Sequence, residues 1–157
     1  MAEGPVFLTT FIEGVLVHGE ASPLVLLVPC QHAPHRGLLM PPQTPWSPGF
    51  LPPALLQTLI QQGWKIPFRF VDRSTLPVVF DERTSRLPTP WLLRLEGLEG
   101  QQRLYLSHLL RTKAPEGQVP APPEGGCWAD ERELAAMDLL PGIKRLCQSA
   151  IQAVKEG

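Results

Sequence analysis

The sequence predicts an α+β fold, because extended apolar segments precede a strongly amphipathic C-terminal helix. Val6–Val17 is rich in β-branched and aromatic residues, and Leu24–Val28 is a continuous apolar run typical of a buried strand. Between these strands and the final helix, a Pro-rich loop leads into a short helix that begins at Pro52. The chain has 157 residues, of which 43% are hydrophobic. We therefore expect one domain, spanning residues 1–157, with one sizeable core.

Charge and composition argue against several classes of protein. The net charge is -1, whereas nucleic-acid binders usually carry a basic excess, so we expect no nucleic-acid partner. No run reaches the roughly 18 apolar residues of a membrane span, and the N-terminus lacks the basic region of a signal peptide. The three cysteines, Cys30, Cys127 and Cys147, are an odd number and lie far apart. This usage is typical of free thiols, and we expect a cytoplasmic protein.

The segment from Leu38 to Ile66 has the most organised local pattern. Pro52 and Pro53 suit a first helical turn, where a missing N–H has no cost. Four apolar residues then fall on one helical face at i, i+4 spacing: Leu55, Leu56, Leu59 and Ile60. We expect Gly63 to end this helix in a left-handed conformation and an extended segment, Trp64–Phe70, to follow.

This order of strand, loop, helix, glycine and strand resembles the core of the Nudix hydrolase family. In that family a strand ends in Leu-Pro-Gly-Gly, a loop contains Pro-Gly-Glu, a helix carries Arg-Glu-hydrophobic-x-Glu-Glu, and a glycine and a hydrophobic residue follow. Here Met40-Pro41-Pro42-Gln43, Pro48-Gly49-Phe50 and Gly63-Trp64 stand at those places, with a slightly longer loop and a slightly shorter helix segment. The resemblance implies a Nudix-like α/β/α sandwich, with a mixed sheet between this helix and the C-terminal helix.

The carboxylates that carry metal chemistry in this family are missing here. The family's helix glutamates hold divalent cations that bridge a diphosphate, but their places, counted back from Gly63, hold Gln57, Ile60 and Gln61. There is no Asp or Glu anywhere from Ala21 to Val71. Mg²⁺ prefers hard oxygen ligands, usually carboxylates. We therefore expect a degenerate Nudix box with no catalytic residue and no metal cofactor. The protein would then bind a nucleotide-type small molecule or a protein partner.

Two alternatives remain open. The chain could be an active hydrolase of nucleoside diphosphate derivatives that uses Mg²⁺ or Mn²⁺ and carboxylates outside the helix. The candidates for such ligands are Asp72, Asp81, Glu82, Glu96 and Glu99. This hydrolase alternative depends on the resemblance in fold alone, which is a weak argument for function. The chain could also be a non-Nudix α+β domain whose resemblance to the family is accidental.

Five residues are candidates for a ligand site: Arg36, Trp46, Arg69, Trp91 and His108. They follow from the resemblance, because the family's pocket lies beside the helix and the sheet and often has an aromatic residue that stacks on a base. The two arginines are the candidate phosphate partners, and His108 is either a satisfied core imidazole or a ligand contact. Tryptophans more often serve in packing. Trp46 is flanked by prolines and is expected to be exposed, so its loop could contact a partner or a second copy of the chain, as in a homodimer.

The loop Pro29–Gly37 contains residue types that bind zinc, namely Cys30, His32 and His35. Structural zinc sites normally take four ligands from paired clusters, and no second cluster lies elsewhere in the sequence. A metal site and a plain surface loop are both compatible with this segment, and we expect the surface loop.

The remaining elements follow from local patterns. Further extended segments are predicted at 65–71, 78–80, 87–95 and 103–111, with a loop at 81–83 and a turn at 97–102. Asp130 and Glu133 have the spacing of a capping box at a helix start. The last helix has an apolar stripe of Ile143, Leu146, Cys147, Ala150, Ile151 and Val154. Because Cys147 lies on this stripe, we expect a buried thiol.

Overall fold

The computed structural model describes residues 7–47, 49–71, 74–80 and 82–156. One mixed sheet has the strand order β10-β2-β1-β9-β5, with β3 on β2, β4 on β1 and β8 on β9, and β6 and β7 form a separate pair. The strands are β1 (Phe7–His18), β2 (Leu24–Pro29), β3 (Leu39–Met40), β4 (Gln43–Pro45), β5 (Phe68–Phe70), β6 (Thr75–Phe80), β7 (Arg83–Pro88), β8 (Leu92–Leu98), β9 (Gln101–Thr112) and β10 (Cys127–Ala129). The helices are α1 (Pro52–Leu56), which continues as the π-helix η1 (Gln57–Gly63), α2 (Glu131–Ala136) and α3 (Pro141–Glu156).

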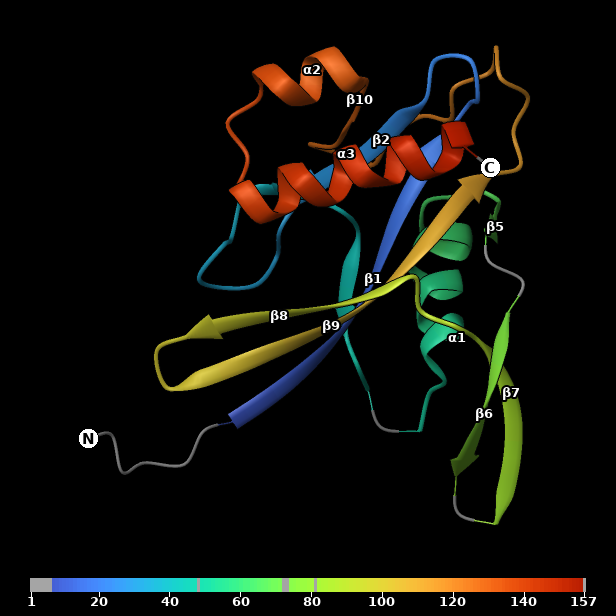
Figure 1. The fold of residues 1–157 in the computed structure, drawn as a ribbon, viewed down its shortest axis with the longest axis vertical. Coiled ribbons are helices and arrows are strands. Elements are labelled where there is room, and N and C mark those ends of the chain that lie inside the picture. The colour runs from blue at the N-terminus through green and yellow to red at the C-terminus, as the bar shows by residue number, and fades with distance from the viewer. Residues whose placement is uncertain (1–6, 48, 72–73, 81, 157) are drawn as a thin grey trace.

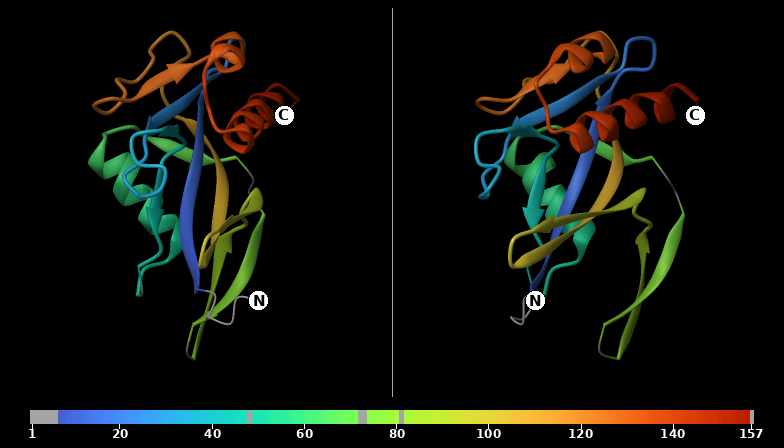
Figure 2. Two further views of the ribbon diagram at one scale, coloured as in Figure 1. Left: turned by 90° about the vertical axis from the view of Figure 1, so that its left-hand side faces the viewer. Right: turned by 60° about the vertical axis from the view of Figure 1, so that its left-hand side comes forward.

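The two longest strands, β1 and β9, form the centre of the sheet. They pair in parallel from Phe7 opposite Gln101 to Val17 opposite Arg111. Because side chains alternate along a strand, Val15 and Val17 face one side of the sheet, and Ile12 and Leu16 face the other. The helix α3 covers the first side, and the α1–η1 helix covers the second (Figures 1 and 2). The predicted α+β class and the layered arrangement are therefore present.

The helix α3 matches its sequence pattern. All six residues of the predicted stripe are buried: Ile143, Leu146, Cys147, Ala150, Ile151 and Val154. They pack against the apolar residues of β1 and β2 in one core cluster. Burial raises the pKa of the Cys147 thiol to about 12, so this cysteine is the buried thiol that the stripe predicted.

The capping box at the start of α2 is also present. The backbone N–H of Glu133 donates to Asp130 Oδ1 at 2.8 Å, and the backbone N–H of Asp130 donates to Glu133 Oε1 at 3.2 Å. Two N–H groups that a helix start leaves unpaired are thus satisfied.

The predicted end of the α1–η1 helix is wrong in its detail. Leu56 and Ile60 are buried as expected, but Gly63 is not in the left-handed region. Lys65 is left-handed instead, with φ 60°. The cause lies in the last turn, where the N–H groups of Trp64 and Ile66 both donate to Ile60 O at 3.2 Å. Because the hydrogen bond from Ile66 to Ile60 spans six residues, the left-handed residue that ends the helix lies two residues after Gly63. The next strand therefore begins only at Phe68.

Two other local predictions are corrected. The segment Arg83–Pro88 forms the strand β7 against β6, although no strand was predicted from Arg83 to Arg86. The predicted turn 97–102 is shorter, because β8 extends to Leu98 and β9 starts at Gln101. Gly100, with φ 76°, supplies the left-handed residue that so tight a turn needs.

Among the described residues, no helix has the length and apolar character needed to cross a membrane.

Candidate functional site

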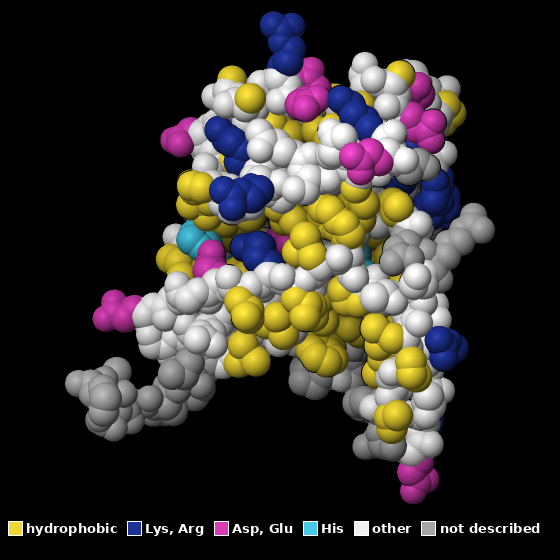
Figure 3. Space-filling view, viewed as in Figure 1, with side chains coloured by type: hydrophobic (Ala, Val, Ile, Leu, Met, Phe, Trp, Pro, Cys, Tyr) yellow, Lys and Arg dark blue, Asp and Glu magenta, His cyan; other side chains and the backbone are white. Residues whose placement is uncertain are grey.

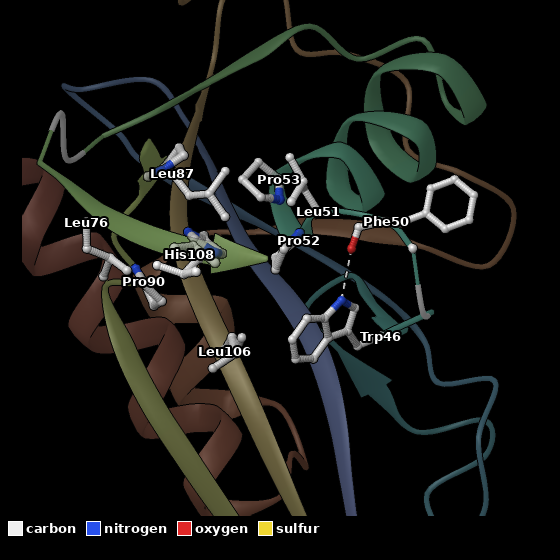
Figure 4. A pocket seen from close by; sticks show the side chains of 14 residues that line it. Trp46, Phe50, Leu51, Pro52, Pro53, Leu76, Leu87, Pro90, Leu106 and His108 are labelled. Carbon is white, nitrogen blue, oxygen red and sulfur yellow. Dashed lines mark hydrogen bonds between the residues drawn. The ribbon is translucent and has the colours of Figure 1, made fainter. Parts of the chain in front are cut away.

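An apolar pocket of about 510 Å³ opens between the β6–β7 hairpin, the start of α1 and the strand β9 (Figure 4). The loop before α1 contributes Trp46, and the first helical turn contributes Pro52 and Pro53. The opposite wall comes from the hairpin, with Leu76, Val78, Val79, Leu87 and Pro88. Leu106 and His108 of β9 also line it. Ligand sites are typically apolar cavities of this size with few polar groups, so this pocket is the candidate functional site.

The strand β9 places His108 in the pocket because of side-chain alternation. Leu106, His108 and Leu110 project from the face of the sheet that α1 covers, whereas Ser107 and Leu109 project from the α3 face. In the register of the two central strands, His108 lies opposite Gly14 of β1. The sheet therefore presents the imidazole beside the first turn of α1.

His108 is buried without a hydrogen bond. Its side chain is 2% exposed, and neither ring nitrogen has a partner among the described residues. The ring of Phe70 packs edge-on against it at 5.3 Å. Burial lowers the pKa of His108 from 6.5 to about 4, so the imidazole is neutral at neutral pH. It then offers one N–H donor and one acceptor nitrogen, and leaving such a group unpaired costs about 1–3 kcal/mol.

Trp46 is the exposed aromatic residue of the pocket. Its side chain is 48% exposed, as predicted for a loop flanked by prolines. The indole Nε1–H donates to the carbonyl oxygen of Phe50 at 3.0 Å, which closes the loop in front of α1. In Figure 4 the Phe50 ring turns away from His108, whereas the other labelled residues surround the cavity. The Nε1–H of the indole is therefore already hydrogen-bonded, and the apolar face of the ring stays exposed.

The structure brings together two of the five candidate residues, Trp46 and His108. Arg36 is exposed in the loop after β2, and Arg69 is exposed on β5. Trp91 is half-buried and packs against the core cluster beneath α3. None of these three lines the pocket, and its described lining contains no Lys, Arg, Asp or Glu. The pocket therefore offers no charge to a phosphate group.

A buried polar cluster on the α3 face of the sheet was missed by sequence reasoning. Glu13 of β1 is fully buried and accepts from Arg94 Nη2 at 2.7 Å, from Ser107 Oγ at 2.6 Å and from Gln43 Nε2 at 3.2 Å. The guanidinium of Arg94 also lies 3.8 Å from the centre of the Tyr105 ring. The only sequence signal for this cluster was a single carboxylate inside an apolar strand. With three donors, Glu13 is a satisfied structural charge.

The alternative carboxylates do not form a common site among the described residues. Asp72 and Asp81 lie outside them. Glu82 is at the tip of the β6–β7 hairpin and Glu99 in the β8–β9 turn, at opposite sides of the molecule (Figure 1). Glu96 contacts His35 Nε2 at 3.0 Å and accepts from the hydroxyl of Tyr105 at 3.3 Å.

The zinc-type residues of the loop after β2 have different contacts. Cys30 Sγ donates to the carbonyl oxygen of His32, His35 contacts Glu96, and the His32 ring packs against Phe11. In the part of the chain that the structure describes, no group of three or more His, Cys, Asp or Glu side chains could hold a metal ion.

Comparison with solved structures shows that the fold is Nudix-like. A NUDIX-family hydrolase from Clostridium perfringens matches with a TM-score of 0.63 and 11% identity, over 92% of this chain and 97% of its own. The Ap4A hydrolase of C. elegans matches with a TM-score of 0.58 and 10% identity, over 93% and 95%. The NUDIX domain of Shewanella oneidensis NrtR, solved with ADP ribose, matches with a TM-score of 0.52 and 14% identity, over 96% and 90%.

No protein-family model matches the sequence, and no curated protein matches it either. At these low identities the structural matches show the fold alone. They confirm the predicted Nudix-like α/β/α arrangement and exclude the alternative of an α+β domain with a non-Nudix fold.

Proposed function

We propose that this protein acts by binding a ligand in the pocket of Trp46 and His108, and not by metal-dependent diphosphate hydrolysis. The observation that carries the proposal is the buried, neutral His108 without a partner in an otherwise apolar pocket. A ligand that bonds a ring nitrogen removes part of the cost of leaving the imidazole unpaired. The α1–η1 helix contains no Asp or Glu, and this supports the absence of metal-dependent hydrolysis.

The ligand that fits this chemistry is an uncharged aromatic heterocycle, such as the base of a nucleotide-type molecule. Its flat faces would pack against Trp46 and the apolar wall, and its edge would supply one hydrogen-bonding group to a ring nitrogen of His108. Any phosphate would lie outside the pocket, because no cationic side chain is present in the described lining. The NrtR NUDIX domain, which has a similar fold, was solved with ADP ribose, and this supports the ligand class.

Isothermal titration with adenosine, ADP-ribose and pyrophosphate tests this proposal. We expect adenosine and ADP-ribose to bind with similar affinity and pyrophosphate not to bind. His108→Leu should weaken binding about 10-fold, the equivalent of one lost hydrogen bond. His108→Gln, which keeps a donor and an acceptor, should retain more affinity than His108→Leu. Leu38→Ala, an exposed residue outside the pocket, is the control. A panel of nucleosides and free bases that never binds would reject this ligand class.

A protein partner is the second candidate, and the exposed apolar residues favour it. Five of the ten exposed large apolar side chains of the described residues line the pocket: Trp46, Phe50, Leu51, Leu76 and Val79. Concentrated exposed apolar surface marks interaction sites. If nucleosides fail, apolar peptides selected from a displayed library should bind the wild type and lose affinity for Trp46→Ala. Equal binding to both proteins would reject this candidate.

The hydrolase alternative is tested separately with a phosphate-release assay on diphosphate substrates in Mg²⁺ or Mn²⁺. We expect no turnover. Turnover that disappears in Glu99→Gln or Glu96→Gln, with folding unchanged, would instead establish a hydrolase with carboxylates outside the helix.

A further inference from the structure

Among the described residues, β8 is the longest strand at an edge of the large sheet. In the part of the chain that the structure describes, β8 pairs only with β9, so its other edge has no strand partner. It is 7 residues long, whereas β3, β4, β5 and β10 are two or three residues long. Its sequence, LLRLEGL, contains no proline and no lysine, the residues that commonly prevent a further strand from adding to an edge. Such an edge can accept another strand by backbone hydrogen bonding.

The side chains of β8 separate into two faces. Leu93 and Leu95 are 62% and 71% exposed on the face that carries the pocket. Apolar side chains gather along this strand and continue toward the β6–β7 hairpin (Figure 3). On the opposite face, Arg94 contacts Glu13, and Glu96 contacts Tyr105 and His35. A strand added to β8 must therefore place apolar side chains beside Leu93 and Leu95. On the other face it must be compatible with the positive charge of Arg94 and the negative charge of Glu96.

We propose that a second copy of this chain occupies this edge, with the two β8 strands antiparallel about a two-fold axis at Leu95. Opposite residues in an antiparallel pair point to the same face, so a two-fold axis normal to the sheet must pass through a residue position. An axis at Leu95 places Arg94 opposite Glu96 of the second copy. It also places Leu92 opposite Leu98 and Leu93 opposite Gly97.

The neighbouring registers are unfavourable. An axis at Arg94 places two guanidinium groups opposite each other, and an axis at Glu96 does the same with two carboxylates. Like charges directly opposite are destabilising, and opposite charges are stabilising. The strand is therefore complementary to itself when the axis passes through Leu95, and this favours a second copy over a strand of arbitrary sequence. In that dimer both pockets lie on the same face of the joined sheet.

Sedimentation velocity across the micromolar range tests whether the dimer exists. We expect the wild type to dimerise with rising concentration and Leu95→Arg to remain a monomer, because it places two cations at the axis. Leu38→Arg, also exposed but away from β8, should dimerise like the wild type. A wild type that stays monomeric at every concentration overturns the proposal, as does a dimer that Leu95→Arg leaves intact.

Disulfide trapping tests the register. Paired strands place opposite Cα atoms about 4.5–5.5 Å apart, within the range that a disulfide spans. Leu95→Cys should form a covalent dimer under mild oxidation, whereas Leu93→Cys should not, because it faces Gly97 of the second copy. The double variant Leu93→Cys with Gly97→Cys should cross-link, and Gly97 has no atom within 4 Å of an added Cβ. Equal cross-linking of the two single variants would overturn this register. The wild type controls for the native cysteines, and neither assay depends on a ligand.

Discussion

At the scale of single residues, two of the polar side chains that are buried in the sheet differ in their hydrogen bonding. Glu13 on the α3 face has three donors and a guanidinium partner. His108 on the α1 face has no partner among the described residues. A buried charge with full hydrogen bonding is a stable structural element, but a buried imidazole without partners lowers the stability of the free protein. The first residue therefore belongs to the scaffold, and the second has hydrogen-bonding capacity that no described residue uses.

The buried ion pair gives a stability prediction. Glu13→Gln should lower the free energy of unfolding by about 3 kcal/mol, because Arg94 then keeps a charge without its partner. Urea unfolding at neutral pH measures this change. Glu99→Gln, in the exposed turn between β8 and β9, should stay within about 0.5 kcal/mol of the wild type. The double variant Glu13→Gln with Arg94→Met should recover most of the loss, and a double variant no more stable than the single one would contradict this explanation.

His108 gives a pH prediction. Its pKa is about 4 in the folded protein and 6.5 in the unfolded chain, so the unfolded chain binds a proton first as the pH falls. The stability linked to this group is complete above pH 6.5 and is lost as the pH falls toward 4. The loss over this interval is about 3 kcal/mol by linkage.

His108→Leu removes this linkage, so the variant should lose less stability than the wild type between pH 7 and pH 4.5 in urea titrations. It should also be about 1–2 kcal/mol more stable at pH 7, because an unpaired polar group is replaced by an apolar one. Parallel pH profiles for the two proteins would show that the imidazole is not buried in solution.

At the scale of elements, the contact between the α1–η1 helix and β1 depends on Gly14. A Cβ at this position would lie 2.7 Å from Leu110 Cδ1 and 3.3 Å from Leu56 Cδ2. The absence of a side chain therefore lets the helix approach the centre of the sheet, where Leu56 and Ile60 are buried. The same strand position lies opposite His108 in the register of the two central strands.

Gly14→Ala should therefore lower the free energy of unfolding by about 1–3 kcal/mol through overpacking. Gly97→Ala is the matched control, since Gly97 also lies in a strand and an added Cβ has no atom within 4 Å. Chemical denaturation of both variants gives the comparison. Equal effects of the two substitutions would mean that strand propensity, and not helix packing, determines the cost at Gly14.

Local sequence patterns predicted some elements and could not predict others. The stripe of α3 and the capping box of α2 depend on residues within a few turns of each other, so periodicity was sufficient. The strand β7 is mostly exposed and polar, and it exists through its pairing with β6. The pairing of Glu13 with Arg94 crosses 81 residues, and only the adjacency of β1, β9 and β8 produces it.

At the scale of the whole molecule, the structure has a well-packed centre and a peripheral hairpin. The strands β1 and β9 lie inside the sheet with helices on both faces, whereas β6 and β7 pair only with each other. Most described side chains of the hairpin are exposed or half-buried. The pocket lies between these two parts. The wall that the β6–β7 hairpin forms is therefore the wall with the fewest strand contacts to the rest of the molecule.

This arrangement predicts a gradient of hydrogen exchange in the free protein. Amides in the middle of β1 and β9 should exchange through global unfolding, and amides of β6 and β7 should exchange through low-energy local opening. Exchange measured by mass spectrometry on the free protein gives both rates. Protection of the hairpin equal to that of β9 would show that other contacts hold it in place. A bound base should slow exchange in the hairpin, because the hairpin forms one wall of the pocket.

The sequence by itself determined the strands β1 and β2, the two amphipathic helices and the absence of carboxylates from Ala21 to Val71. These features depend on local periodicity and composition, which can be recognised within a short segment of the sequence. The tertiary structure decided which faces the strands present, that Glu13 pairs with Arg94, and that Trp46 and His108 share one pocket while Arg36, Arg69 and Trp91 lie elsewhere. Those outcomes depend on strand order and register, which bring distant segments together and which local patterns do not specify.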